Sequence, residues 1–178
     1  MRIYLIGYMG SGKSKVGKSL SKLLNFSFSD TDHLIEEKAG SSVTQIFQDQ
    51  GEMFFRELET EMLGETFEKT KTVISTGGGL PTHDDNMKKM LDHGIVLYLE
   101  AAPGLLFQRL SVNREGRPLI EKLNDSELTN QIQKHLLERG PVYRRADLTF
   151  PAANVDVKKI HEAIILHPKF TSLNLERR

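Results

Sequence analysis

Short apolar runs, separated by longer stretches of mixed polarity, recur along the whole chain. The apolar runs are rich in Ile, Val, Leu and Phe, which is typical of buried strands. The predicted strands are 2–6, 26–29, 72–75, 95–99 and 148–150. The longer stretches between them predict helices near 13–24, 52–69, 81–93, 102–110, 125–138 and 155–166.

This alternation of strands and helices predicts an α/β fold, a five-stranded parallel sheet flanked by helices on both faces. The 178 residues suit a single domain, 1–178, that buries a substantial core. Ligands of such sheets bind beyond the carboxyl ends of the strands. The residues that directly follow each predicted strand are therefore the candidates for chemistry.

The first predicted strand runs into a glycine-rich segment, Gly7 to Ser14, with the sequence GYMGSGKS. It fits the P-loop pattern G-x-x-x-x-G-K-[ST] and lies between a strand and a helix, where the mechanism requires it. Backbone N–H groups and the following helix dipole would hold phosphate oxygens. Lys13 would reach the β- and γ-phosphates, and the Ser14 hydroxyl would bind Mg²⁺. A glycine-rich turn that binds nothing is the alternative.

Two further strand ends carry candidate groups. Asp30 and Asp32 follow the second predicted strand, so one carboxylate can lean toward Mg²⁺ while the other faces a second ligand. The alternative is that an aspartate here caps a helix that begins near His33. Gly77 to Gly79 follow the third strand, and their backbone N–H groups could bind a small anionic or polyhydroxy substrate. A tight turn is the alternative for these glycines.

Two arginines stand out near helix ends, and one of them, Arg56, is a candidate for binding a carboxylate. Arg56 has Glu52 four residues before it and Glu59 three residues after it, a spacing that suits ordinary surface ion pairs. Alternatively, Glu59 orients the Arg56 guanidinium toward a substrate carboxylate, a bidentate role that suits arginine. Arg139 lies where a predicted helix closes and could instead interact with the helix dipole.

Composition narrows the class of protein. Lys+Arg 24 equals Asp+Glu 24, which argues against nucleic acid as the main partner. The sequence has no cysteine, and therefore neither disulfides nor Cys-ligated zinc. No apolar run approaches the ~20 residues of a membrane span, and the first strand leaves no room for a signal peptide. We expect a cytoplasmic protein with neither a nucleic-acid nor a membrane partner.

Together these motifs resemble the shikimate kinase family over essentially the whole chain. The matching segments are GYMGSGKSKVG at 7–17, DTDHLIE at 30–36, IFQDQGEMFFRELE at 46–59, GGG at 77–79, RPL at 117–119 and RGPVY at 139–143. A P-loop alone is widely shared, whereas this ordered set is highly specific.

The resemblance implies ATP-dependent phosphorylation of the 3-hydroxyl of shikimate, a step toward chorismate and the aromatic amino acids. It implies that Lys13, Asp32 and Arg117 are catalytic, with Asp32 taking the hydroxyl proton, and that Ser14 and Asp30 organise Mg²⁺. The implied shikimate-binding residues are Asp32, Arg56, Gly77, Gly78, Gly79 and Arg139. The implied ATP-binding residues are Gly10, Ser11, Gly12, Lys13, Ser14, Lys15, Arg109, Arg114 and Asn154.

The resemblance also implies a monomer with a helical substrate-binding segment at about 31–60 and a mobile lid at about 111–125. Two departures matter: Lys15 stands where the family commonly has Thr, and 110–116 has no firm alignment. The arginine that contacts adenine therefore stays open between Arg109 and Arg114. A carbohydrate kinase similar to gluconate kinase and a non-catalytic nucleotide-binding module are the alternative functions.

Overall fold

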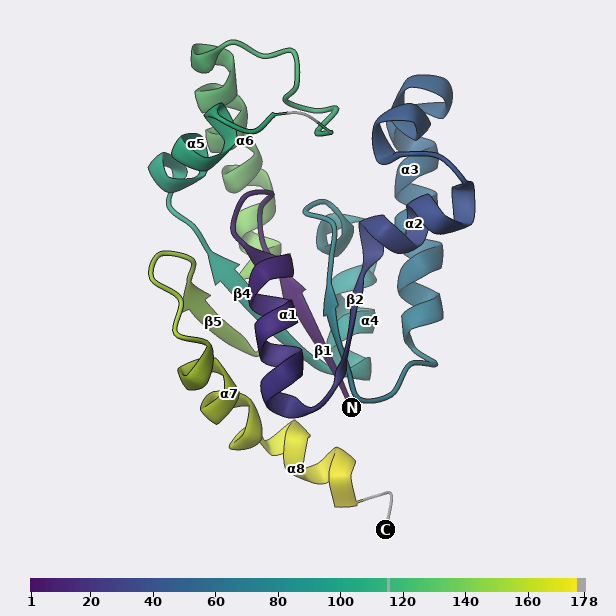
Figure 1. Ribbon diagram of the computed structural model, residues 1–178, viewed down its shortest axis with the longest axis vertical. Coiled ribbons are helices and arrows are strands. Elements are labelled where there is room, and N and C mark those ends of the chain that lie inside the picture. The colour runs from purple at the N-terminus through teal and green to yellow at the C-terminus, as the bar shows by residue number, and fades with distance from the viewer. Residues whose placement is uncertain (115, 176–178) are drawn as a thin grey trace.

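A computed structural model describes residues 1–114 and 116–175 (Figure 1). Within them lies a five-stranded sheet in the order β2-β3-β1-β4-β5, with every neighbouring pair parallel. The strands are β1 Arg2–Ile6, β2 Ser27–Asp30, β3 Thr72–Ser75, β4 Ile95–Glu100 and β5 Leu148–Pro151. The predicted parallel sheet is confirmed, and each strand boundary lies within one residue of its expected position.

Helices surround the sheet, with α1 and α7 on one face and α4 on the other (Figure 1). The helices are α1 Lys13–Leu24, α2 Thr31–Ala39, α3 Val43–Thr66, η1 Leu80–Thr82, α4 Asn86–His93, α5 Pro103–Ser111, α6 Asp125–Tyr143, α7 Val157–Ile165 and α8 Pro168–Leu175. Across residues 1–114 and 116–175, no helix combines the length and the hydrophobicity that crossing a bilayer requires.

Alternation along β1 explains why both faces of the sheet are covered. Ile3 and Leu5 pack into a core with residues of α1, α5, α6 and α7, whereas Tyr4 and Ile6 pack into a second core with α3, α4 and Tyr143. A third, smaller core lies between α2 and α3 and contains Ile35, Ile46, Phe55 and Met62. The expected substrate-binding segment therefore has a core of its own.

Several helix boundaries differ from the expectation; the predicted helix 81–93, for example, is divided into η1 and an α4 that begins at Asn86. Helix α3 begins at Val43 rather than near 52, because helical residues also precede Gly51, whose non-helical backbone (φ 84°, ψ 173°) kinks the helix without ending it. Helix α6 continues past 138 to Tyr143 although Pro141 lies inside it. Helix α2 begins at Thr31, two residues before His33, because the Asp30 side chain caps it.

Two helical glycines allow a test of how closely α1 packs on the sheet. A Cβ at Gly17 would lie 2.6 Å from Phe28 Cε2 and 2.9 Å from Leu5 Cδ1, so Gly17→Ala should reduce the free energy of unfolding by about 1–3 kcal/mol. A Cβ at Gly64 in α3 would meet nothing within 4 Å. Gly64→Ala should therefore raise that free energy by about 0.5–1 kcal/mol. Urea unfolding of both variants measures the difference, and equal stabilities would contradict the packing argument.

Candidate active site

The strand order brings three loops together at one edge of the sheet. The segments after β1, β2 and β3 all lie at the carboxyl ends of adjacent parallel strands. They are the glycine-rich segment of residues 7–14, the Asp30–Asp32 pair and the three glycines at 77–79. This is the edge where open α/β sheets bind ligands.

The glycine-rich segment presents a buried cation next to the start of α1. Gly12 has φ 99°, an αL conformation that glycine adopts without strain, and it leads directly into the helix. The Lys13 ammonium donates to the carbonyls of Gly7 at 2.9 Å and Tyr8 at 3.0 Å. An ammonium has three protons, so one remains for another oxygen. Burial lowers the pKa of Lys13 to about 8, although Asp32 and Asp30 oppose that shift.

Three side-chain oxygens gather beside this cation. Ser14 Oγ donates to Asp30 Oδ2 at 2.7 Å and lies 3.2 Å from Ser75 Oγ. Asp30 Oδ1 also accepts from the Asp32 N–H, so Asp30 is both a helix cap and a neighbour of Ser14. Hydroxyl and carboxylate oxygens are the ligands that a hard divalent cation prefers.

The second carboxylate, Asp32, lies in an environment that favours its neutral form. The Oδ1 atom is buried and has no hydrogen-bond partner among the described residues. Burial raises the pKa of Asp32 to about 7, with Asp30 and Glu59 adding to the shift and Lys13 opposing it. A carboxyl group with this pKa can exchange a proton near neutral pH.

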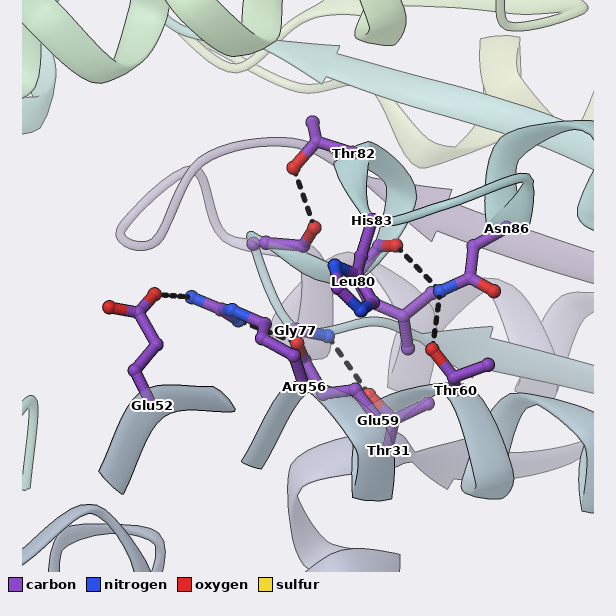
Figure 2. Close-up of polar contacts among 12 residues, drawn as sticks. Thr31, Glu52, Arg56, Glu59, Thr60, Gly77, Leu80, Thr82, His83 and Asn86 are labelled. Carbon is purple, nitrogen blue, oxygen red and sulfur yellow. Dashed lines mark hydrogen bonds and ion pairs between the residues drawn. The ribbon is translucent and has the colours of Figure 1, made fainter. Parts of the chain in front are cut away.

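Arg56 is held between two carboxylates of its own helix (Figure 2). Its guanidinium donates to Glu59 Oε2 at 2.5 Å and to Glu52 Oε1 at 2.7 Å. Glu59 is only 1% exposed, so the pair between Arg56 and Glu59 is a buried ion pair rather than a surface one. Such a pair fixes the direction of the guanidinium.

Gly77 and Gly79 pack directly against this ion pair. A Cβ at Gly77 would lie 2.2 Å from Glu59 Oε1, and one at Gly79 would lie 2.3 Å from Arg56 Nη1. The Gly77 N–H donates to Thr31 Oγ1 at 2.9 Å, and Tyr143 Oη donates to the Gly78 carbonyl at 2.5 Å. The glycines therefore permit a close approach rather than only a tight turn.

Thr31 is the position that sequence reasoning missed here. It is fully buried, and its hydroxyl ties α2 to the glycine loop. The sequence feature that could have indicated this role is the position of Thr31 between two aspartates, Asp30 and Asp32. Asn86 has a similar structural role, because its amide donates to Thr60 Oγ1 at 3.0 Å and to the Leu80 carbonyl at 3.1 Å (Figure 2).

Two adjoining cavities occupy this edge of the sheet. The acceptor cavity, about 250 Å³, is lined by Met9, Asp32, Val43, Phe47, Phe55, Arg56, Glu59, Gly77, Gly78, Gly79, Gly116, Arg117, Pro118, Leu119 and Arg139. The phosphate cavity, about 290 Å³, is lined by Met9, Gly10, Gly12, Lys13, Ser14, Lys15, Asp30, Asp32, Ser75, Thr76, Gly78 and Arg117. Met9, Asp32, Gly78 and Arg117 line both, so these four residues mark the border.

A third cavity, about 450 Å³, also borders the glycine-rich segment. Its lining includes Gly10, Ser11, Gly12, Lys15, Arg109 and Asn154. Arg109 donates to the carbonyls of Gly10, Ser11 and Ala152 at 2.9–3.1 Å. Arg114 does not line this cavity, because its guanidinium donates to the Leu123 carbonyl and to Asp125. Of the two candidate arginines, the structure places Arg109 beside the glycine-rich segment.

Comparison with known proteins identifies the family. The family model described as shikimate kinase matches residues 9–167. A curated shikimate kinase of Phocaeicola vulgatus is 42% identical over 164 residues, which cover 92% of this chain and 94% of that relative. The chain belongs to the shikimate kinase family. Its fold, the P-loop and this membership make it an ATP-dependent kinase.

Solved structures of shikimate kinases have the same fold. The enzyme of Bacteroides thetaiotaomicron aligns with a TM-score of 0.87 at 38% identity, over 93% of this chain and 99% of that one. The enzyme of Acinetobacter baumannii, solved in complex with shikimate, aligns with a TM-score of 0.83 at 33% identity, over 99% of this chain and 94% of that one. The P-loop kinase architecture is thus established.

The raised pKa of Asp32 leads to a prediction about stability. In the folded state Asp32 keeps its proton up to about pH 7. In the unfolded state an aspartate has the ordinary pKa of 3.8 and loses the proton at a lower pH. The folded state therefore binds more protons between these values, and stability falls as pH rises through that window. Asp32→Asn removes the ionisation, so it should raise the melting temperature by about 2–6 °C at pH 8 and by less at pH 5.

Asp85 provides the matched control. It is exposed and pairs with Lys89 at 2.7 Å, and this hydrogen bond lowers the pKa of Asp85. Asp85→Asn should therefore give no gain in melting temperature at pH 8. Calorimetric scans at both pH values compare the two variants with the parent. A stability difference for Asp32→Asn that does not grow with pH would contradict the assigned environment.

Proposed function

We propose that this chain is a shikimate kinase, which transfers the γ-phosphoryl group of ATP to the 3-hydroxyl of shikimate and yields shikimate 3-phosphate and ADP. The observation that carries the proposal is the border between the acceptor cavity and the phosphate cavity, where Asp32 and Arg117 line both. A phosphoryl group that moves between two substrates must cross such a border. The product would supply the route to chorismate and the aromatic amino acids.

Shikimate would bind in the acceptor cavity through its carboxylate and hydroxyl groups. Arg56 and Arg139 both line that cavity, and guanidinium groups recognise carboxylates through bidentate hydrogen bonds. The rings of Phe47 and Phe55, with centroids 4.7 Å apart, form an apolar wall for the carbon ring. The N–H groups of Gly78 and Gly79 are the candidate donors to the hydroxyl groups, because the Gly77 N–H donates to Thr31 Oγ1.

Transfer would proceed by attack of the shikimate 3-hydroxyl oxygen on the γ-phosphorus. The bond between that phosphorus and the bridging oxygen breaks, ADP leaves, and the hydroxyl proton passes to Asp32. Its pKa of about 7 suits a general base near neutral pH. Lys13 and Arg117 would stabilise the charge on the transferred group, a role in which positioned cations contribute most of the catalysis.

The oxygens near the phosphate cavity fit Mg²⁺. Ser14 Oγ and Asp30 Oδ2 would hold it. This fits an ion that is usually bound by one or two carboxylates together with substrate phosphates. When bound, Mg²⁺ would neutralise phosphate charge.

We further propose that 31–60 is the substrate-binding segment of a single domain and that 111–125 is a mobile lid that carries Arg117. Glu115 lies outside the described residues. Closing the lid over both cavities would exclude water and so limit hydrolysis of ATP. We propose a monomer that works in the cytoplasm without a nucleic-acid partner.

A coupled assay of ADP formation tests the function. Purified protein with Mg²⁺-ATP receives shikimate, gluconate or no acceptor, and Lys13→Ala serves as the inactive control. We expect shikimate to stimulate ADP formation by at least about 10²-fold, because the acceptor-binding groups suit its carboxylate and ring. Faster turnover with gluconate would favour a carbohydrate kinase. An absence of acceptor-dependent turnover would favour the nucleotide-binding module.

The role of Arg117 can be tested separately. Arg117→Ala should lower kcat by about 10³-fold, the lower end for arginine side chains that stabilise a transferred phosphoryl group. The dissociation constant for ADP should change much less. Arg145, which is exposed after α6, supplies the control: Arg145→Ala should keep the parent kcat. Single-turnover phosphoryl transfer is the measurement, and an unchanged rate in Arg117→Ala would remove Arg117 from the mechanism.

A further inference from the structure

One face of α6 carries four polar or aromatic residues at intervals of four. They are Gln131, His135, Arg139 and Tyr143, and this spacing places them one above another along the helix. His135, Arg139 and Tyr143 are buried. The proposed mechanism uses only Arg139 of this row, so the other three require an explanation.

His135 joins α6 to the phosphate-binding segment. Its Nδ1 lies 2.9 Å from Tyr8 Oη, and its Nε2 lies 2.8 Å from the amide of Gln131. Tyr8 is 1% exposed and His135 is 7% exposed, so this contact is shielded from water. Burial, and then the charge of Arg139, lowers the pKa of His135 to about 4. The ring is therefore neutral, with one donor and one acceptor nitrogen that its two partners satisfy.

Tyr8 in turn contacts one residue from the lining of each cavity, Lys13 and Arg139. Its carbonyl accepts from Lys13 Nζ at 3.0 Å, and its ring centroid lies 5.8 Å from Arg139 Cζ. A cation at this distance from an aromatic ring is attracted to it. The Tyr8 side chain is thus the direct link between the phosphate-binding segment and the guanidinium that we propose for the carboxylate.

Arg139 needs such support because its own helix is weak at this point. Gly140 and Pro141 follow it, and these are the two residue types least favourable inside a helix. Pro141 has no N–H to donate to the carbonyl four residues earlier. The position of Arg139 therefore depends on contacts outside the helix: His135 with Tyr8 one turn before it, and Tyr143 with the Gly78 carbonyl one turn after it.

We propose that Tyr8 and His135 are positioning residues for Arg139, and that their hydrogen bond sets the affinity of the enzyme for the carboxylate of its acceptor. This inference rests on the proposed function, because it takes shikimate as the acceptor and Arg139 as a ligand of its carboxylate. Neither residue contacts the reacting atoms. Their effect should consequently appear in acceptor binding rather than in the chemical step.

Titration calorimetry with shikimate and, separately, with ADP tests the proposal. Tyr8→Phe removes only the hydroxyl, and His135→Leu removes both ring nitrogens at similar volume. Each should raise the dissociation constant for shikimate about 3- to 10-fold, the range for losing one buried neutral hydrogen bond. The dissociation constant for ADP and kcat at saturating shikimate should stay within about twofold.

Three further variants separate positioning from general damage. Tyr4→Phe removes another buried tyrosine hydroxyl, one that lies 3.2 Å from Thr66 Oγ1 in the second core, and should leave shikimate affinity unchanged. His135→Asn keeps a polar atom near the Nδ1 position and should bind shikimate more tightly than His135→Leu. The double variant Tyr8→Phe/His135→Leu should bind shikimate no more weakly than the weaker-binding single variant, because the two substitutions remove the same hydrogen bond.

Two results would overturn the proposal. One is shikimate affinity within about 1.5-fold of the parent in both Tyr8→Phe and His135→Leu. The other is an equal loss of ADP and shikimate affinity, which would indicate a distorted phosphate-binding segment instead. If the parent enzyme itself neither binds nor phosphorylates shikimate, the proposed function fails as well, and the parent titration reports that outcome independently of the variants.

Discussion

The buried ion pair between Arg56 and Glu59 is the interaction on which the acceptor side of the site depends. Glu59 is almost fully enclosed, and a buried carboxylate without a partner would be strongly destabilising. The pair also accounts for the glycines after β3, since side chains at Gly77 or Gly79 would overlap its atoms. The need to keep Glu59 paired with Arg56 thus explains the arginine on α3 and the glycines at 77 and 79 in the loop after β3.

Local patterns were sufficient to predict the sheet and the phosphate-binding segment. Strands such as β1 and β4 are short apolar runs, and the P-loop is a contiguous motif between a strand and a helix. Where the helix ends were misjudged, a local rule was overridden: Gly51 breaks the geometry of α3 without ending it, and burial of Tyr143 carries α6 past Pro141. In α6, tertiary packing outweighs intrinsic propensity.

Pairings between distant residues could not be predicted in the same way. Tyr8 and His135 are 127 positions apart, and a tyrosine inside a glycine-rich motif gives no sign of which helix it contacts. The choice between Arg109 and Arg114 was open for the same reason, because it depends on the course of the chain between α5 and α6. The candidate residues were predictable from the sequence, whereas their partners required the fold.

The contact of Arg114 with the Leu123 carbonyl and Asp125 has a consequence for conformational entropy. It joins two points nine positions apart within the proposed lid, and a capping box formed by Asn124 and Glu127 fixes the chain immediately afterwards. The arc that carries Arg117, 114–123, is therefore slightly shorter than the whole connection of 112–124 from α5 to α6. The entropy lost on ordering a loop rises with its length, by about 0.6 kcal/mol for each doubling. The shorter arc consequently saves only about 0.2 kcal/mol of this entropy, so the main effect of the tether is to fix both ends of the arc that carries Arg117.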